Sequence, residues 1–317
     1  MLEPLSRAPR EPLVAPGAID CHASDMTATF SADVTLAAAQ NRLAQHTQWL
    51  PIDGVNLQSL GTLCGCNSTG PLRLGYGAWR DLLLGVQFVN GAGELITVGG
   101  RTVKNVAGYD VTKFMVGQRG VFGRLLTLTT RTYRKPDQAL LVRYAPDPSL
   151  FAKLMPTPLK PHWTLLTSDA LFCGYHGDEP AIAFFETAVA AMAPMEIQRR
   201  ELSEDIVHRQ SLWSFDDDIV FRASVPPANL AEFARNLKVK SWAADAAFGI
   251  VQGLVGNDRK AIEALARQVN GTVAFFAGIY GKPLDLPTSD AERKLLERLK
   301  TAFDSQHMLN PLPWRNA

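Results

Sequence analysis

Apolar residues alternate with polar ones or recur at helical spacing near the start of the chain, and this pattern predicts the first elements. Residues 26–31 alternate, which is typical of a half-buried strand. Ser31 or Asp33 is expected to cap a helix that runs to about residue 46. The apolar face of this predicted helix consists of Leu36, Ala39 and Leu43.

Two apolar runs farther along the chain predict a β-hairpin. They span residues 82–89 and 94–98, and they flank the turn-forming segment Asn90-Gly91-Ala92-Gly93. Residues 121–133 predict a further strand region, which ends at Lys135-Pro136.

After Pro136 the glycine content falls, and strand and helix patterns follow one another. Strands are predicted over 140–144, 163–167, 170–175, 219–225, 247–254 and 273–276, and helices over 179–192, 229–237, 260–269 and 291–303. This order predicts an open sheet with helices on one side, within an α+β fold. The last helix carries an apolar stripe that predicts a core face, with a partner-helix contact as the alternative. The stripe consists of Leu295, Leu296, Leu299 and Phe303.

Composition narrows the class of protein. The 317 residues suffice for two domains, and 46% hydrophobic with 20% charged residues is typical of a globular chain. A net charge of +1 gives no electrostatic reason to expect nucleic acid or a membrane surface as partner. No apolar run reaches the ~20 residues of a membrane span, and the first residues lack the apolar core of a signal peptide. With only four cysteines, reduced thiols and therefore a cytoplasmic location are expected.

Glycine recurs every few residues between Leu50 and Thr130, with apolar runs in between. This pattern predicts strands joined by tight turns in which the backbone passes close to a bulky group. Successive N–H groups in such turns form concave nests that bind phosphate oxygens. The stretch therefore predicts a cradle for a large phosphorylated cofactor.

An ordered set of motifs in this stretch resembles a known family. Lys104-Asn105-Val106-Ala107-Gly108-Tyr109-Asp110 is followed by Gly117 and then by Gly120-Val121-Phe122-Gly123. With the segments before it, the set is similar to the FAD-binding fold of the vanillyl-alcohol oxidase and p-cresol methylhydroxylase (PCMH-type) flavoproteins. Within that family, the set resembles the FAD-binding E subunits of glycolate oxidase.

The resemblance implies a set of residues that contact the cofactor. Residues 59–62 resemble the family's Thr-x-Gly-Gly loop, which lies on the flavin and its pyrophosphate. Residues 120–123 resemble the loop near the adenosine, and Asn310-Pro311 resembles the segment that returns to the flavin. The implied cofactor-binding residues are Pro51, Ser59, Gly61, Thr62, Asn67, Gly70, Gly75, Gly77, Lys104, Gly108, Tyr109, Gly120, Val121, Gly123 and Asn310.

Physical chemistry adds specific expectations at this loop. Backbone N–H groups of Gly61 and Thr62 could hold the diphosphate without a lysine. The small residues Gly65, Ser68 and Gly70 would let the main chain lie flat against the isoalloxazine ring. The flavin would carry out the redox chemistry, while the protein would supply position and electrostatics.

The sequence departs from the family pattern in three places. No glycine-rich pyrophosphate loop precedes Thr27, Thr62 stands where the family has a second glycine, and Leu312 replaces the glycine of the Asn-Pro-Gly segment. The cofactor is therefore expected to be non-covalent FAD that is weakly held or has been lost. The expected layout is an irregular arm over 1–17, an N-terminally truncated FAD-binding domain over 18–136, and a substrate or cap domain over 137–317 whose C-terminal end returns to the flavin site.

Two functions from different classes remain open. In the first, the chain is an FAD-dependent subunit that oxidises a small 2-hydroxy acid such as glycolate by hydride transfer to FAD. The resemblance then implies a larger FAD-binding paralogue and an iron–sulfur subunit as partners. In the second, the chain is a non-catalytic scaffold subunit that retains the flavoprotein fold. No catalytic residue is named, because the cap carries no recognisable histidine or arginine motif.

Several single residues have two interpretations. A lone Cys64-Gly65-Cys66 without a second pair or a nearby histidine favours core thiols over a metal site, and no metal is expected. Lys104 is interpreted either as a residue that steers an anionic substrate or a phosphate, or as a solvated surface lysine. Tyr109-Asp110 contacts the flavin or fixes a turn through the aspartate side chain, and the turn is favoured.

Overall fold

The computed structural model describes residues 12–101, 110–213, 215, 219–255, 259–276, 283–285 and 289–312. These residues form two compact units. Unit 1 comprises 12–69, 77–101, 110–135 and 289–312, and unit 2 comprises 70–76 and the described residues between 136 and 285. The layout differs from the expected one at two places, because 70–76 pack with the second unit and 289–312 with the first.

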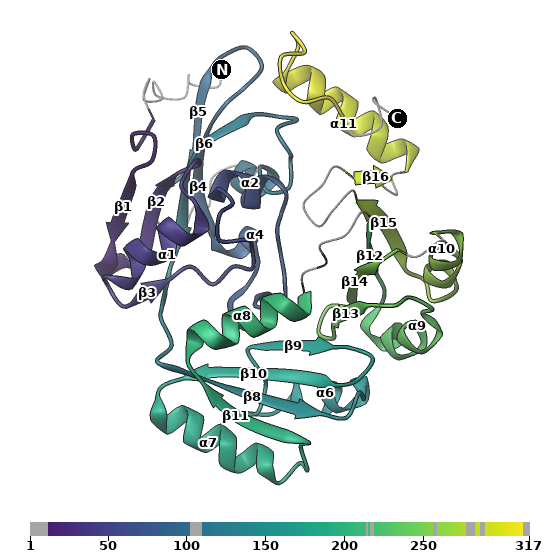
Figure 1. Ribbon diagram of the computed structural model, residues 1–317. Helices are drawn as coiled ribbons and strands as arrows, with labels where there is room; N and C mark the ends of the chain where they lie inside the picture. The colour runs from purple at the N-terminus through teal and green to yellow at the C-terminus, as the bar shows by residue number, and fades with distance from the viewer. Residues whose placement is uncertain are drawn as a thin grey trace. The chain divides into compact units, whose positions relative to one another are not determined.

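Unit 1 is built on a five-stranded antiparallel sheet (Figure 1). In spatial order its strands are β1 (Ile19–His22), β2 (Thr27–Ser31), β6 (Arg124–Arg131), β4 (Leu83–Val89) and β5 (Leu95–Gly99). A second, two-stranded sheet pairs β3 (Gln48–Trp49) with β7 (Tyr133–Arg134). The predicted hairpin is confirmed as β4 and β5, with the Asn90 side chain accepting hydrogen bonds from the N–H groups of Ala92 and Glu94.

The helices described in unit 1 are α1 (Leu36–Ala44), α2 (Leu60–Gly65), α4 (Trp79–Leu82), α5 (Val111–Phe114) and α11 (Asp290–Phe303), with a 3-10 turn η1 at Ala23–Asp25. Four of these helices, α1, α2, α5 and α11, begin at a residue whose side chain caps the first turn. The predicted caps Ser31 and Asp33 are wrong, since Thr35 caps α1 by accepting from the Ala38 N–H. Asp110 caps α5 through the Lys113 N–H, which fits the favoured turn interpretation.

The core face expected on α11 is confirmed for three of its four residues. Leu296, Leu299 and Phe303 pack against a small core, whereas Leu295 is 57% exposed. Lys300, one residue after Leu299, is 5% exposed and occupies the inner face instead. The buried face of α11 therefore includes a charged residue that an apolar pattern does not predict.

Unit 2 contains a nine-stranded sheet in which the paired strands are antiparallel. In spatial order its strands are β11 (Glu196–Arg200), β8 (Gln138–Tyr144), β10 (Leu171–Gly177), β9 (Trp163–Leu166), β13 (Trp242–Asp245), β14 (Ile250–Leu254), β12 (Val220–Ser224), β15 (Thr272–Phe276) and β16 (Pro283–Asp285). Its helices are α3 (Arg73–Tyr76), α6 (Pro148–Leu154), α7 (Glu179–Ala190), α8 (Leu202–Trp213), η2 (Pro227–Asn229), α9 (Leu230–Asn236) and α10 (Arg259–Gln268).

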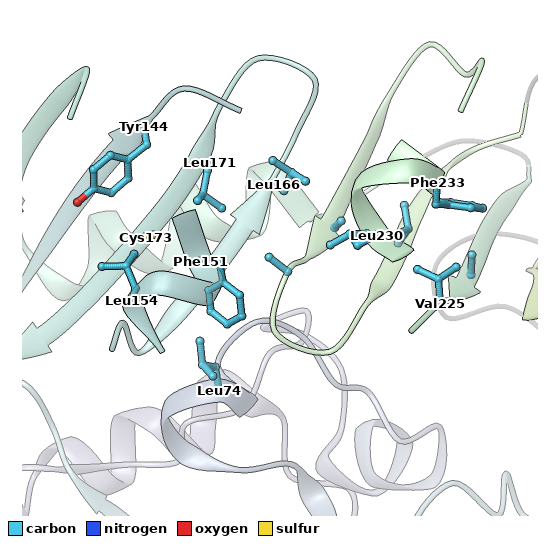
Figure 2. Packing of buried hydrophobic residues seen from close by; sticks show 14 of the residues in the cluster. Leu74, Tyr144, Phe151, Leu154, Leu166, Leu171, Cys173, Val225, Leu230 and Phe233 are labelled. Carbon is cyan, nitrogen blue, oxygen red and sulfur yellow. The ribbon is translucent and has the colours of Figure 1, made fainter. Parts of the chain in front are cut away.

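Helices cover both faces of this sheet, so the prediction of helices on one side is wrong. Helices α6, α7, α9 and α10 contribute to one large apolar core, part of which Figure 2 shows around Phe151, Cys173 and Phe233. Helix α8 lies on the opposite face from α7 (Figure 1). Its buried residues include Asp205 and Arg209, so its inner face gives no apolar pattern.

The chain has an α+β fold, as expected. Within the described residues, no helix has both the length and the apolar character needed to cross a membrane.

Candidate functional site

The glycine-rich loop of unit 1 contains a short helix where the sequence predicted turns between strands. Ser59 precedes α2, and its Oγ accepts a hydrogen bond of 3.2 Å from the Thr62 N–H. The hydroxyls of Ser59 and Thr62 also lie 2.9 Å apart. A Ser N-cap with this geometry satisfies an N–H group that the first turn of a helix leaves unpaired.

The two N–H groups expected to hold the diphosphate at this helix have hydrogen-bond partners inside the protein. The Gly61 N–H donates to the Ala32 carbonyl at 2.8 Å, and the Thr62 N–H donates to Ser59. A Cβ at Gly61 would lie 2.8 Å from the Ala32 carbonyl oxygen, so this glycine is required by packing against the chain after β2. Both N–H groups are therefore engaged inside the protein and are not free to bind phosphate.

A second loop is attached to the end of α2. The Gly117 N–H donates to the Cys64 carbonyl at 3.0 Å, and the Arg119 N–H donates to the Gly65 carbonyl at 2.9 Å. Gly117, Arg119 and Gly120 have φ values of 85°, 54° and 77°, in the left-handed region. The two glycine-rich loops predicted from the sequence thus lie side by side in unit 1.

Among the glycines of these two loops, Gly65 is the one beside which the described residues leave open space. It is buried, yet a Cβ built there meets no heavy atom of the described residues within 4 Å. A buried glycine that faces open space lets a flat group approach the backbone closely. The open space at Gly65 is therefore compatible with the face of an aromatic ring system.

Gly120 has a different role, because its open side is filled by Asn310. A Cβ at Gly120 would lie 2.6 Å from Asn310 Nδ2. The Asn310 side chain donates to the Arg119 carbonyl at 2.7 Å, and the Asn310 N–H donates to the Gly120 carbonyl at 3.1 Å. The structure thus brings the predicted residues Gly120 and Asn310 together through contacts within the protein.

A buried ion pair supports this junction. Lys300 Nζ donates to Asp304 at 2.5 Å, to the Val121 carbonyl at 2.9 Å and to the Asn310 carbonyl at 2.8 Å. Burial would raise the pKa of Asp304, but the hydrogen bonds and charge of Lys300 and the N–H groups of Met308 and Leu309 outweigh it and lower the pKa. Lys300 therefore holds helix α11, the Val121 loop and the C-terminal segment in one arrangement.

The remaining predicted residues are placed as follows. Pro51 is buried, and Asn67 is exposed with a φ of 50°. Gly70 and Gly75 belong to unit 2, where a Cβ at Gly75 would lie 2.9 Å from the His162 carbonyl oxygen. A Cβ at Gly77 would meet Asp81 and one at Gly123 would meet Phe88. Lys104, Gly108 and Tyr109 lie outside the described residues.

The two nearby cysteines have different surroundings. Cys64 is fully buried, and burial raises the pKa of its thiol to about 12. Cys66 is partly exposed, and its sulfur lies 3.9 Å from an Arg119 guanidinium nitrogen. Both are free thiols, and among the described residues no group of histidine, cysteine and acidic side chains is arranged to bind a metal.

Unit 2 contains a buried polar network that the sequence analysis did not predict. Its centre is Asp205 on α8, which is 0% exposed. The carboxylate accepts hydrogen bonds from His176 at 3.0 Å, Arg209 at 2.8 Å, and the Trp163 indole at 3.1 Å. Burial would raise the pKa of Asp205, but the His176 hydrogen bond and the Arg209 charge outweigh it and hold the pKa below its usual value.

The network continues from His176 toward α3. The Tyr76 hydroxyl lies 2.8 Å from the ring nitrogen Nδ1 of His176. The backbone N–H of His176 donates a hydrogen bond of 3.0 Å to Nδ1 of His162. The rings of Tyr76, His162 and His176 pack together, with centroids 5.3–5.8 Å apart. Burial and the neighbouring His176 lower the pKa of His162 to about 4, so this imidazole is neutral at neutral pH.

Sequence reasoning missed this network because its members are far apart in the chain. Tyr76 and His176 are separated by 100 positions, and His176 and Asp205 by 29. The only local signal was the spacing of Asp205 and Arg209, four residues apart on α8. The same spacing is common on exposed helix faces, so it did not indicate a site.

Comparison with known protein families finds one match in the N-terminal part of the chain. Residues 16–114 match the sequence model of the FAD binding domain. This match confirms the resemblance to FAD-binding flavoproteins that the motifs indicated, and it supports FAD as the expected cofactor.

Individual relatives add detail. The chain is 29% identical over 130 residues to the glycolate oxidase subunit GlcE of Escherichia coli (strain K12). The aligned stretch covers 40% of this chain and 37% of that protein. It is 34% identical over 92 residues to the glycolate oxidase subunit GlcD of Bacillus subtilis (strain 168), covering 28% of this chain and 20% of that protein. The matched stretches are therefore well under half the length of these relatives.

A solved structure of alkyldihydroxyacetonephosphate synthase resembles the chain with a TM-score of 0.66 over 91% of this chain and 64% of that one. At 13% identity this likeness concerns the fold alone.

Proposed function

We propose that the chain is an FAD-binding subunit of an oxidoreductase that acts on a small 2-hydroxy acid such as glycolate. The observation that carries the proposal is the match of residues 16–114 to the FAD binding domain. The names of the relatives, two of them subunits of glycolate oxidase, support the substrate class and the role as a subunit.

The described residues of unit 1 fit a flavin at one position. The open space at Gly65 suits the flat ring, and residues 65–67 and 117–120 would provide the backbone beside it. The phosphates would need donors other than Gly61 and Thr62, whose N–H groups are already used. When bound, the flavin would supply the acceptor for a hydride from the carbon that bears the substrate hydroxyl.

The partners proposed for the chain are a larger FAD-binding paralogue and an iron–sulfur subunit that receives the electrons. The proposed location is the cytoplasm, beside an inner membrane through these partners. A tagged full-length chain, purified from its own host, should retain both subunits and should reduce an artificial electron acceptor when glycolate is added. Purification of the chain alone, with no paralogue present, would contradict the proposed assembly.

A scaffold subunit without FAD is the second candidate. The engaged N–H groups of Gly61 and Thr62 favour it, because they remove two expected phosphate contacts. The open space at Gly65 favours the flavoprotein. The visible absorption spectrum of the purified assembly, together with flavin analysis of each separated subunit, distinguishes the two candidates.

A further inference from the structure

Most backbone N–H groups that can be followed in the two glycine-rich loops of unit 1 already donate to oxygen atoms of the chain. The first loop, residues 59–69, contributes Gly61, Thr62, Leu63, Cys66, Asn67 and Ser68, and the second, residues 117–123, contributes Gly117, Arg119, Val121 and Phe122. A phosphate that leaves water needs charged or hydrogen-bonding partners in the protein. A diphosphate on these loops therefore depends on side chains more than on the backbone.

Arg119 is the one lysine or arginine within residues 59–69 and 117–123. A guanidinium presents five N–H donors in a planar fork that matches phosphate oxygens, and it remains charged over the pH range in which proteins are folded. Hydrogen bonds from such a cation to a phosphate are about twice as strong as those between neutral groups. Arg119 thus has the chemistry that a diphosphate requires on these loops.

The backbone of Arg119 is fixed from both sides. Its N–H donates to the Gly65 carbonyl at 2.9 Å, and its carbonyl accepts from the Asn310 side chain at 2.7 Å. Its φ of 54° lies in the left-handed region, which is uncommon for a residue with a Cβ. The chain therefore holds an arginine in a conformation that glycine adopts with less strain, and its side chain starts from a fixed point beside the end of α2.

The guanidinium of Arg119 reaches the residue that follows Gly65. One of its terminal nitrogens lies 3.9 Å from the sulfur of Cys66. At Gly65 a Cβ would meet no described atom within 4 Å. Cys66 and Arg119 are both partly exposed, so a solute can reach them. A thiol is a weak acceptor, and a phosphate oxygen would be a far stronger partner for the same nitrogen.

We propose that the Arg119 guanidinium binds the diphosphate of FAD and makes the chain select FAD over riboflavin, which has the same ring and no phosphate. This inference rests on the proposed function and supplies a partner for the phosphates that Gly61 and Thr62 do not provide. Arg119 contacts the cofactor in this role and takes no part in the transfer of a hydride or a proton.

The first test compares three flavins on the flavin-free, full-length wild-type chain. FAD, FMN and riboflavin share one ring system and differ in phosphate, so titrations followed by flavin fluorescence isolate the phosphate contribution. FAD should bind at least about tenfold more tightly than riboflavin, because a charged hydrogen bond contributes about that factor or more. Raising the KCl concentration from about 0.05 to about 0.5 M should weaken the binding of FAD and leave that of riboflavin nearly unchanged.

The second test replaces the arginine. Arg119→Gln keeps a long polar side chain on the same backbone but removes the charge, so FAD should bind about ten- to a hundredfold more weakly. Its dissociation constant should also respond less to KCl. Arg119→Lys should bind FAD with intermediate affinity, since lysine keeps the charge but not the fork. The matched control is Arg124→Gln at the start of β6, an exposed arginine that should bind FAD like the wild type.

Riboflavin provides the second control, because its binding should change by less than about twofold in Arg119→Gln if the arginine contacts phosphate. Melting temperatures without flavin show whether each variant is folded. If Arg119→Gln melts well below the wild type, the comparison of Arg119→Lys with Arg124→Gln and the response of the wild type to KCl decide the question. If riboflavin binds too weakly to titrate, the response of FAD binding to KCl in the wild type and in Arg119→Gln decides it.

The outcomes separate this inference from the proposed function. A folded Arg119→Gln that binds FAD as tightly as Arg124→Gln overturns the role of Arg119 and leaves an FAD-binding subunit standing. Equal losses of FAD and riboflavin binding in Arg119→Gln do the same, since the arginine would then act on the ring. A wild-type chain that binds no flavin overturns the proposed function, and the inference falls with it. A loss confined to FAD and FMN supports both.

Discussion

The glycine-rich loops of unit 1 and the polar network of unit 2 reach their geometry by different means. In unit 1, each glycine-rich loop is formed by residues close in sequence, and backbone hydrogen bonds from Gly117 to Cys64 and from Arg119 to Gly65 join the two loops. In unit 2, side chains from β9, β10 and α8 meet at one buried carboxylate, Asp205. Local motifs therefore indicate the first site, whereas the second becomes visible only in the folded chain.

The two regions should also respond differently to substitution. The network of unit 2 holds buried charges, so removing one member breaks a buried ion pair. The loops of unit 1 contain glycines, so the effect of a substitution at each glycine depends on what the added side chain would meet. The following predictions test this contrast, from the largest expected effect to the smallest.

Asp205→Ala is expected to cause the largest loss of stability. The substitution leaves the Arg209 guanidinium, 1% exposed, without its carboxylate. Removing one partner of a buried pair costs about 3–5 kcal/mol, and denaturant unfolding of unit 2 reports it. The control is Glu204→Ala, an exposed position on the same helix, which should change the free energy of unfolding by less than about 0.5 kcal/mol. Equal effects of the two variants would contradict a buried charge network.

Gly120→Val is expected to destabilise unit 1 by an intermediate amount. Its φ of 77° disfavours a β-branched residue, and its Cβ would lie 2.6 Å from Asn310 Nδ2. Backbone strain of this kind costs about 1–3 kcal/mol. Gly65→Val serves as the comparison, since its Cβ meets no described atom, and its melting temperature should stay near that of the wild type. A Gly120→Val protein with an unchanged melting temperature would show that Asn310 moves aside freely.

His162 should give the smallest effect, seen as pH dependence. Its pKa is about 4 in the folded chain, against an ordinary value of 6.5. Between these values the unfolded chain binds more protons than the folded one, so stability falls as the pH drops from 6.5 toward 4. The groups facing His162 are Tyr76, His176 and Phe185, with Lys160 and Asp205 acting through their charge.

The measurement is the free energy of unfolding at pH 7 and pH 5 for wild type and for His162→Gln. The wild type should lose stability at pH 5, and the variant should lose less because it cannot take up that proton. The pKa of His208 is also lowered, mainly by burial, and adds a loss of the same sign in both proteins. An identical loss in both proteins would contradict a neutral, buried His162.

Much of the fold could be predicted from the sequence, because its elements have clear periodicity. The β4–β5 hairpin, helix α7 and the α+β class followed from local patterns. Helix α8 was missed because Asp205 and Arg209 occupy its buried face. The core face of α11 was predicted at Leu296, Leu299 and Phe303, but the buried Lys300 on it was not. In each case long-range partners made a charged residue acceptable in the interior, which no local pattern reveals.

The same limit applies to the candidate sites. Motif order indicated the loops around Gly65 and Gly120, but it could not show that Asn310 fills the space at Gly120 or that the Gly61 N–H is already used. Whether a glycine faces a ligand or another part of the protein depends on tertiary contacts. Gly65 is therefore the residue on which the assignment of unit 1 depends most.

The most direct test is a titration of the purified, flavin-free chain with FAD, followed by flavin fluorescence, for wild type and for Gly65→Val. The wild type should bind one FAD saturably, and Gly65→Val should bind at least about tenfold more weakly, corresponding to about 1.4 kcal/mol. Gly100→Val is the matched control, since its Cβ also meets no described atom within 4 Å and it lies outside the two loops. It should bind FAD like the wild type. A folded wild-type chain that shows no saturable binding, or a Gly65→Val variant that binds as tightly as Gly100→Val, would contradict the assignment.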